Sequence, residues 1–227
     1  MSKFIKLILI LLIGIIVFNK KIVSYYYVNK FSRWIERPVL IDNVNFNYSG
    51  LIEIKKIQVL NINKFYYKNI FEAEKITLNV DLRSIFSDLI IIKNVDITNP
   101  KFFLDIKIVE KTENLNEQEK KLPSYEDNIG LAQKINQDTP DKIWPKKSRD
   151  INFLILKSEI SGAQAKVKVS SISEPAKINL SHMKFGNFGN KKNYQHYKDV
   201  LKLILFDIFA RTKDVKIKKI LKEIYNS

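Results

Sequence analysis

The chain of 227 residues contains no cysteine and only two histidines. The absence of cysteine excludes disulfides, thiolate catalysis and most structural zinc sites, and it is compatible with either a reducing or an oxidising compartment. His182 and His196 stand in no metal-ligand spacing with one another, so we expect both to be structural. No constellation of nucleophile, base and metal ligands is visible. The sequence therefore predicts a protein that is not an enzyme, with no catalytic residue, no cofactor and no metal site.

Arginine is also scarce, with five residues among 39 basic ones. The formal net charge of +15 would by itself suggest nucleic acid or anionic lipid as a partner. Recognition of bases and phosphates, however, favours arginine because of its bidentate fork. Lysine, asparagine and isoleucine are all abundant, which is the pattern expected from an AT-rich genome, so part of the charge is compositional. We therefore expect no nucleic-acid partner.

An unbroken apolar run, Leu7 to Phe18, lies near the N-terminus and is directed to a membrane. With Phe4 and Ile5 it gives about 22 Å of helix, which is shorter than the roughly 30 Å hydrocarbon core. Flanking lysines must then snorkel or the helix must continue, and the tyrosines that follow lie where an interfacial aromatic belt is expected. The expected interface residues are Lys6, Lys20, Lys21, Tyr25, Tyr26 and Tyr27.

A cleavable signal peptide is the competing interpretation of this run, because its charged start and length fit one. The residues that follow it, Asn19 to Val23, offer no small side chains at the spacing of a cleavage site, so we favour an uncleaved signal anchor. More basic residues follow the run than precede it, and the positive-inside rule would then keep the main domain in the cytoplasm. The lysine excess throughout the chain weakens that count.

The stretch Ile76 to Ile108 predicts three consecutive strands. The first and the last alternate between apolar and polar residues, which indicates an antiparallel sheet that is wetted on one face. We expect Asp81, Asp96 and Asp105 on the polar face, where solvation explains a carboxylate. The apolar face is expected to form a core or the floor of a groove. Its residues, the candidate lipid-facing set, are Ile76, Leu78, Val80, Leu82, Phe102, Leu104, Ile106 and Ile108.

The remaining segments predict a mainly β (α+β) protein: a membrane helix, a curved antiparallel sheet with an apolar face and a C-terminal amphipathic helix. The break in alternation at Lys55-Lys56 indicates a β-bulge, and Thr98 to Pro100 and Ser161-Gly162 are predicted turns. The helix has an expected irregularity near Thr212 to Asp214. The predicted divisions are the anchor and juxtamembrane residues 1–37, a β-region at 38–109, a polar linker or insertion at 110–149, further strands of the same domain at 150–190 and the helix at 191–227.

The order of these segments resembles the AsmA-like family of Gram-negative envelope proteins, which includes AsmA and, more distantly, TamB. An anchor and a strand hairpin precede ITLNVDLRSIFSDLIIIKNVDITNPKFFLDI, in which a strand ending in Asp81-Leu82 leads through a short turn to a strand and an Asn99-Pro100 step. Short members continue with a linker, with segments like INFLILKSEISGAQAKVKV and AKINLSHMKFGNFG, and with a closing amphipathic helix. The resemblance covers most of the chain except Glu110 to Arg149.

This resemblance implies a single-pass inner-membrane protein with its main domain in the periplasm and an apolar groove in a curved β-structure. It implies a role without catalysis in outer-membrane biogenesis or envelope lipid homeostasis, and it supplies no catalytic residues. The implied partners are membrane lipid, with acyl chains in the groove, and an envelope protein. This chain is much shorter than the members thought to span a periplasm, so bridge-type transport by this protein alone is not expected.

Two functions remain open, because the sequence does not show what the C-terminal helix covers. If the helix caps only one end of the sheet, a groove lined by Ile, Leu, Val and Phe stays open, and a lipid acyl chain fits such a surface. If the helix covers the whole apolar face, the domain is closed. The protein is then expected to be a structural or scaffolding subunit of an envelope complex that carries no lipid and docks through a sheet edge or its helix.

Overall fold

The computed structural model describes residues 28–29, 32–33, 36–47, 49–62, 64–115, 118–129, 152–190 and 195–226. The predicted membrane anchor and all six expected interface residues lie outside this part of the chain, as do residues 130–149 of the predicted linker. No helix among the described residues is long and apolar enough to span a membrane.

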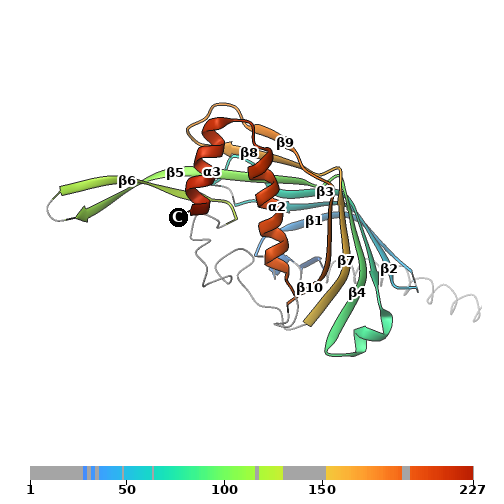
Figure 1. The fold of residues 1–227 in the computed structure, drawn as a ribbon. Coiled ribbons are helices and arrows are strands. Elements are labelled where there is room, and N and C mark those ends of the chain that lie inside the picture. Colours follow the sequence, from blue (N-terminus) through green and yellow to red (C-terminus); the bar gives the residue numbers. More distant parts are fainter. Residues whose placement is uncertain are drawn as a thin grey trace, which may run out of the picture.

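The described residues form one eleven-stranded curved sheet with two C-terminal helices. Figure 1 shows this arrangement, and the prediction of a mainly β protein is confirmed. The sheet is mixed and not antiparallel throughout, because β4 pairs with β7, β5 with β8 and β10 with β11 in parallel. The strands are β1 (Val39–Phe46), β2 (Leu51–Leu60), β3 (Asn69–Val80), β4 (Leu89–Thr98), β5 (Lys101–Leu115), β6 (Gln118–Asp127), β7 (Asn152–Ser161), β8 (Gln164–Val169), β9 (Ala176–Asn179), β10 (Met183–Gly189) and β11 (Gln195–His196).

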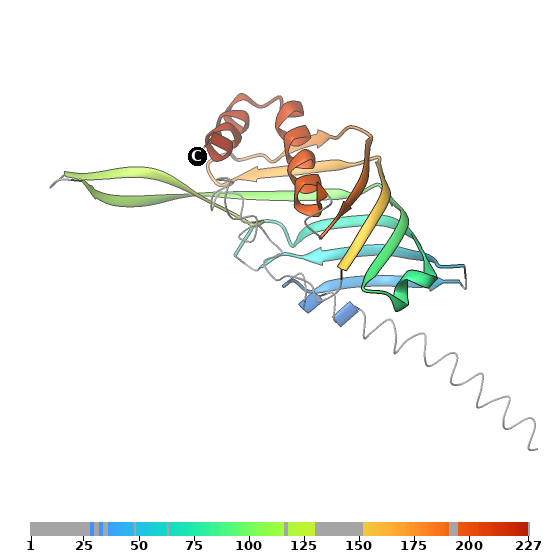
Figure 2. The same cartoon turned by 60° about the horizontal axis from the view of Figure 1, so that its bottom comes forward.

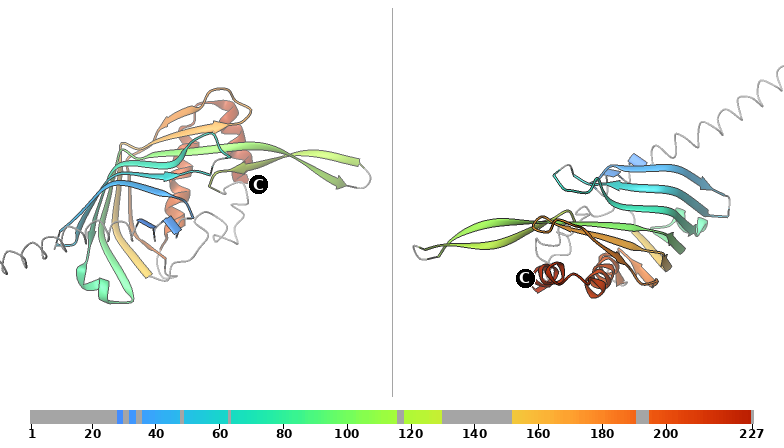
Figure 3. Two further views of the ribbon diagram at one scale, coloured as in Figure 1. Left: turned by 180° about the vertical axis from the view of Figure 1, so that it is seen from behind. Right: turned by 90° about the horizontal axis from the view of Figure 1, so that it is seen from above.

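A sharp bend divides the sheet into two arms, which Figure 3 shows meeting along one line. The first arm contains β5, β8 and β9, the second contains β4, β7 and β10, and β1 to β3 run through both. Strand β7 pairs with β4, and β8 with β5, at one constant offset, from Thr98 opposite Ser161 to Lys101 opposite Gln164. The path β4–β5 is therefore a single bent strand, and β7–β8 repeats it alongside.

The residues at the bend form a line across the sheet, which we call the corner line. Its members are Asp42, Lys56, Glu74, Asn99, Gly162 and Ser181. Lys56 and Asn99 have φ of 50° and Gly162 has φ of 65°, in the left-handed region that turns a chain sharply. The β-bulge expected at Lys55-Lys56 does not form, because the β2–β3 register continues unchanged across it; the break in alternation instead marks the bend at Lys56.

Beyond the bent sheet, β5 and β6 continue as a two-stranded ribbon that projects from the body in Figures 1 and 2. The sequence predicted a polar linker or insertion from residue 110 onward. Residues 110–115 and 118–127 instead complete an antiparallel hairpin that runs from Ile106 opposite Asp127 to Leu115 opposite Gln118.

The predicted C-terminal helix is two helices, α2 (Tyr197–Arg211) and α3 (Val215–Asn226), separated at the expected irregularity. Thr212 ends α2 by donating from its hydroxyl to the Ile208 carbonyl at 2.7 Å. Asp214 then starts α3, because its carboxylate accepts the backbone N–H of Ile217 at 3.0 Å, as a helix N-cap does. The apolar stripe of the sequence is thereby folded into a helical pair that lies over the sheet (Figure 2).

Candidate functional site

The concave side of the bent sheet is an apolar surface, which we call the inner face. Residues directly opposite one another on paired strands share a face. One row in the first arm joins Val39, Val59, Phe71, Phe102, Ala165 and Ile178. A second row, in the second arm, joins Val44, Ile54, Ile76, Ile97, Ile160 and Met183. Ile97 packs against both hydrophobic clusters of the described residues, so the inner face is continuous from β1 to β10.

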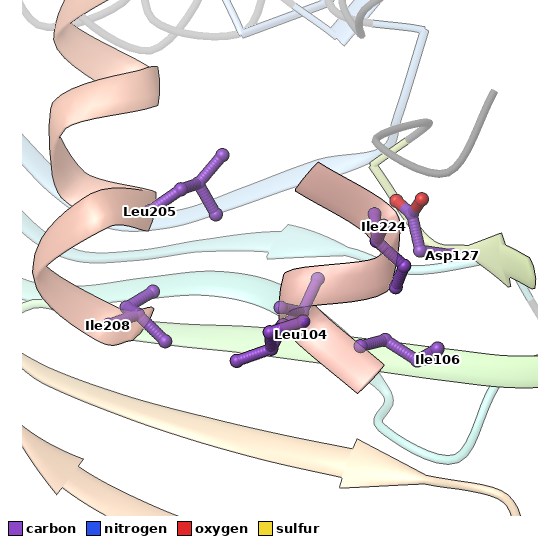
Figure 4. Close-up of a pocket in the computed structure, with 7 residues that line it drawn as sticks. Leu104, Ile106, Asp127, Leu205, Ile208 and Ile224 are labelled. Atoms are coloured by element: carbon purple, nitrogen blue, oxygen red, sulfur yellow. The ribbon is translucent and has the colours of Figure 1, made fainter. Parts of the chain in front are cut away.

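Helices α2 and α3 cover the C-terminal part of this inner face. Apolar residues of both helices pack with residues of β5, β7, β8, β9 and β10 in one buried cluster. Figure 4 shows Leu104 and Ile106 of β5 pointing toward Leu205, Ile208 and Ile224 of the helices. The room left between them is about 10 Å³, close to the minimum for one water molecule. An acyl chain therefore has no space beneath the helices.

A latch between α2 and the last residue of the corner line fixes this cover. The Asp207 carboxylate accepts hydrogen bonds from the Ser181 backbone N–H at 2.7 Å and from the Ser181 hydroxyl at 2.8 Å. Arg211, one turn further along α2, donates to the same carboxylate at 3.0 Å. Burial would raise the pKa of Asp207, but these hydrogen bonds outweigh it and hold the pKa below its usual value.

Within the part of the chain that the structure describes, the N-terminal part of the inner face in the second arm is less covered. Ile52 and Ile54 of β2 and Ile76 and Leu78 of β3 are half-buried, and they lie opposite one another in the β2–β3 ladder. In Figure 2, strands β1 to β3 lie toward the edge of the sheet that is farther from α2 and α3. We call these four side chains the uncovered strip. The side chains of the strip are aliphatic, so its chemistry suits hydrocarbon and not a polar ligand.

The eight candidate lipid-facing residues do not form a single surface. Leu104 and Ile106 are 3% and 1% exposed beneath the helices, and Phe102 packs against the same cluster. Ile76 and Leu78 belong to the uncovered strip, with the buried Val80 at its end. The other two leave the inner face: Leu82 begins the short helix η1 (Leu82–Phe86) after β3 has ended, and Ile108 is exposed near the base of the ribbon.

Asp105 lies on the opposite, outer face of β5, where the sequence predicted a solvated carboxylate. This prediction is wrong. This residue is 3% exposed, not solvated. Its carboxylate accepts the backbone N–H groups of Tyr66 and of Tyr67, the latter at 3.1 Å, and Asn128 bonds to the backbone of β5 beside it. Burial raises the pKa of Asp105 above its usual value, against these hydrogen bonds and two nearby lysines. Alternation misses this burial because the segment that covers β5 is distant in sequence.

Within the described residues, no group of His, Asp and Glu side chains is arranged to hold a metal ion. His182 lies 2.9 Å from Glu159 at the surface, with both side chains more than 40% exposed. Comparison of the chain with protein-family models, with curated proteins and with solved structures finds no match.

Proposed function

We propose that this protein is a membrane-anchored, non-enzymatic envelope protein of AsmA-like type, with its main domain in the periplasm. It acts in outer-membrane biogenesis or envelope lipid homeostasis by holding lipid acyl chains along the uncovered strip. The observation that carries this proposal is the division of the inner face. One continuous apolar surface is closed by helices at its C-terminal end and leaves Ile52, Ile54, Ile76 and Leu78 half-buried at the other.

The chemistry of the strip supports an acyl chain as its ligand. Each methylene group removed from water contributes about 0.8 kcal/mol, so a chain lying along several aliphatic side chains gains useful affinity without any hydrogen bond. The cavity beneath α2 and α3 is lined by similar residues but holds about 10 Å³, so the helical part serves as core. The proposed lipid site therefore consists of residues of β2 and β3, and it does not include the residues of β5.

A scaffolding function without lipid is the second candidate, and the projecting ribbon favours it. An isolated two-stranded hairpin is at best marginally stable in water, so a long one gains from packing on another molecule. The ribbon reaches beyond the sheet in Figure 1, which suits docking to a larger envelope complex. In this alternative the uncovered strip is a further protein contact.

Photocrosslinking of the full-length protein in membranes tests the proposal. A phospholipid with a photoreactive acyl chain is incorporated, and crosslinked peptides are located by mass spectrometry. We expect labels on the uncovered strip, fewer labels in Leu78→Asp and no loss in the matched control Thr77→Asp, which places the same charge on the opposite face of β3. Absence of label from the strip, or equal labelling of both variants, would refute lipid binding and favour the scaffold.

A further inference from the structure

The turn between β3 and β4 is held rigidly by hydrogen bonds of its own side chains. Asp81 caps η1, because its carboxylate accepts the backbone N–H of Arg83 at 3.0 Å. The Ser84 hydroxyl donates to the Asp81 carbonyl at 2.6 Å and accepts the backbone N–H of Ile91 in β4 at 2.8 Å. Ser84 itself is 6% exposed. The conformation of η1 is therefore fixed against β4 before anything binds to it.

This rigid turn presents apolar side chains to solvent. Phe86 is 94% exposed, Ile85 48% and Leu82 40%. The neighbouring β1–β2 turn adds Leu51 at 39%, and the two turns touch, because a Cβ at Gly50 would lie 3.3 Å from the Leu82 side chain. We call Leu51, Leu82, Ile85 and Phe86 the apolar tip. Scattered apolar residues on a surface are ordinary, but several side chains grouped on one fixed turn indicate a contact surface.

We propose that the apolar tip inserts into the interface of the lipid bilayer to which the chain is anchored. This inference rests on the membrane anchoring in the proposed function. The anchor gives the reason to choose a bilayer as the occupant: the apolar run ends at Phe18 and the described chain begins at Val28, so at most about 35 Å of extended chain separates them. The bilayer surface is therefore always within reach of the domain.

The position of the tip agrees with this orientation. In Figure 2, the short blue segment that contains residues 32–33 and η1 lie on the same lower side of the molecule, whereas the connection between α2 and α3 lies at the top. The tip has the composition of an interfacial contact, with a phenylalanine and two aliphatic side chains on η1 beside the exposed Arg83. Phenylalanine, isoleucine and leucine enter the headgroup region while the arginine remains with the phosphates.

Insertion of the tip has a consequence for the uncovered strip. Leu51 directly precedes Ile52 of the strip, and Leu78 is two residues from the end of β3. The end of the strip thus lies beside the tip. With the tip in the bilayer, an acyl chain passes from the membrane to the strip without crossing water, whose exclusion of hydrocarbon would otherwise form the barrier.

The absence of cysteine makes a direct test possible, because a single introduced cysteine labels one position in the full-length chain. Ile85→Cys carries an environment-sensitive dye, and Val215→Cys, which replaces a 79% exposed residue at the start of α3, is the matched control. Both proteins are reconstituted into phosphatidylethanolamine–phosphatidylglycerol vesicles whose acyl chains carry a nitroxide quencher. We expect a blue shift and several-fold stronger quenching at position 85 than at position 215, and loss of that difference on adding Phe86→Asp.

Four results would contradict the inference. Equal quenching at both positions places the tip in water, and a blue shift at position 85 without quenching places it against protein. Quenching that is unaffected by Phe86→Asp removes the phenylalanine from the contact. A full-length chain that does not float with the vesicles overturns the anchoring itself, and with it both this inference and the proposed function. If the chain floats and the tip is not quenched, the proposed function stands and the tip inference fails.

Discussion

The side chain of Asn99 fills the space that a side chain at Gly162 would need. An ideal Cβ built at Gly162 would lie 2.1 Å from Asn99 Oδ1, and Gly162 has φ of 65°. The two residues stand side by side on the corner line, where the bent path β4–β5 meets its parallel copy β7–β8. Glycine at this position therefore serves both the backbone conformation and the close approach of the neighbouring corner.

Replacement of Gly162 by alanine is accordingly expected to destabilise the domain. A left-handed backbone costs a residue with Cβ about 1–2 kcal/mol, and the clash with Asn99 adds to this. The midpoint of urea unfolding should fall in Gly162→Ala. Adding Asn99→Gly, which keeps the positive φ and removes the clashing amide, should recover the part of the loss due to the clash. Additive losses in this double-mutant cycle would show that the two corners are independent.

The two parts of the inner face should respond differently to the same truncation. Leu104→Ala, beneath the helices, is expected to cost about 2–5 kcal/mol, as in other buried leucine sites. Leu78→Ala, in the uncovered strip, should cost clearly less because its side chain is half-buried. Chemical unfolding of both variants measures the difference. Equal losses would mean that the strip is closed core and has no room for a ligand.

The alternation of apolar residues was sufficient to predict many of the strands, but not β6, which lies in the predicted polar linker. It also did not show how the strands pair. Thr98 to Pro100 and Ser161-Gly162 have turn chemistry, and Lys55-Lys56 has the pattern of a bulge. All three are bends on the corner line. A bend and a reversal both use residues that tolerate positive φ, and only the pairing of the neighbouring strands distinguishes them. That pairing joins β4 to β7 in parallel across a long stretch of sequence, where no local signal specifies it.

The candidate site could also be predicted only in part, because local patterns show which face of a strand is apolar but not which segment covers it. The apolar face of Ile76 and Leu78 follows from period-two alternation, and so does that of Leu104 and Ile106. The amphipathic stripe of the C-terminal segment indicates a helix that packs on an apolar surface. It does not indicate that the helices cover β5 and leave β3 uncovered. The buried Asp105 was missed because burial on a polar face depends on a covering segment elsewhere in the chain.

The latch at Ser181 should make the helical cover sensitive to acid. The folded-state pKa of Asp207 lies below its unfolded value, so the carboxylate contributes stability that is present above the unfolded pKa. This stability is lost as the pH falls through the lowered folded-state pKa. The protection factors of α2 amides, which correct hydrogen exchange for its intrinsic pH dependence, should therefore fall in acid in the native protein. Asp207→Asn, which keeps the shape, should exchange faster at neutral pH and lose part of the acid dependence. An unchanged profile would exclude the latch.

Asp105 should show the opposite dependence on pH, because burial raises its pKa. The folded protein then binds more protons than the unfolded chain above the ordinary aspartate pKa, so this residue's contribution to stability falls as the pH rises through that window and stays low above the raised pKa. Asp105→Asn removes the buried charge and keeps an oxygen acceptor for the N–H groups of Tyr66 and Tyr67. Its stability at neutral pH should equal or exceed that of the native protein.

Asp105→Ala separates the loss of the charge from the loss of the hydrogen-bond acceptor. Alanine also removes the charge, but it leaves two backbone N–H groups on the loop before β3 without their acceptor. Both hydrogen bonds are partly buried, so we expect a total cost of about 1–3 kcal/mol. Urea unfolding at neutral and at mildly acidic pH should therefore rank the asparagine variant above the alanine variant at both. Equal stability of the two variants would mean that the carboxylate does not hold this loop on β5, and that its burial is a consequence of packing by the neighbouring rings.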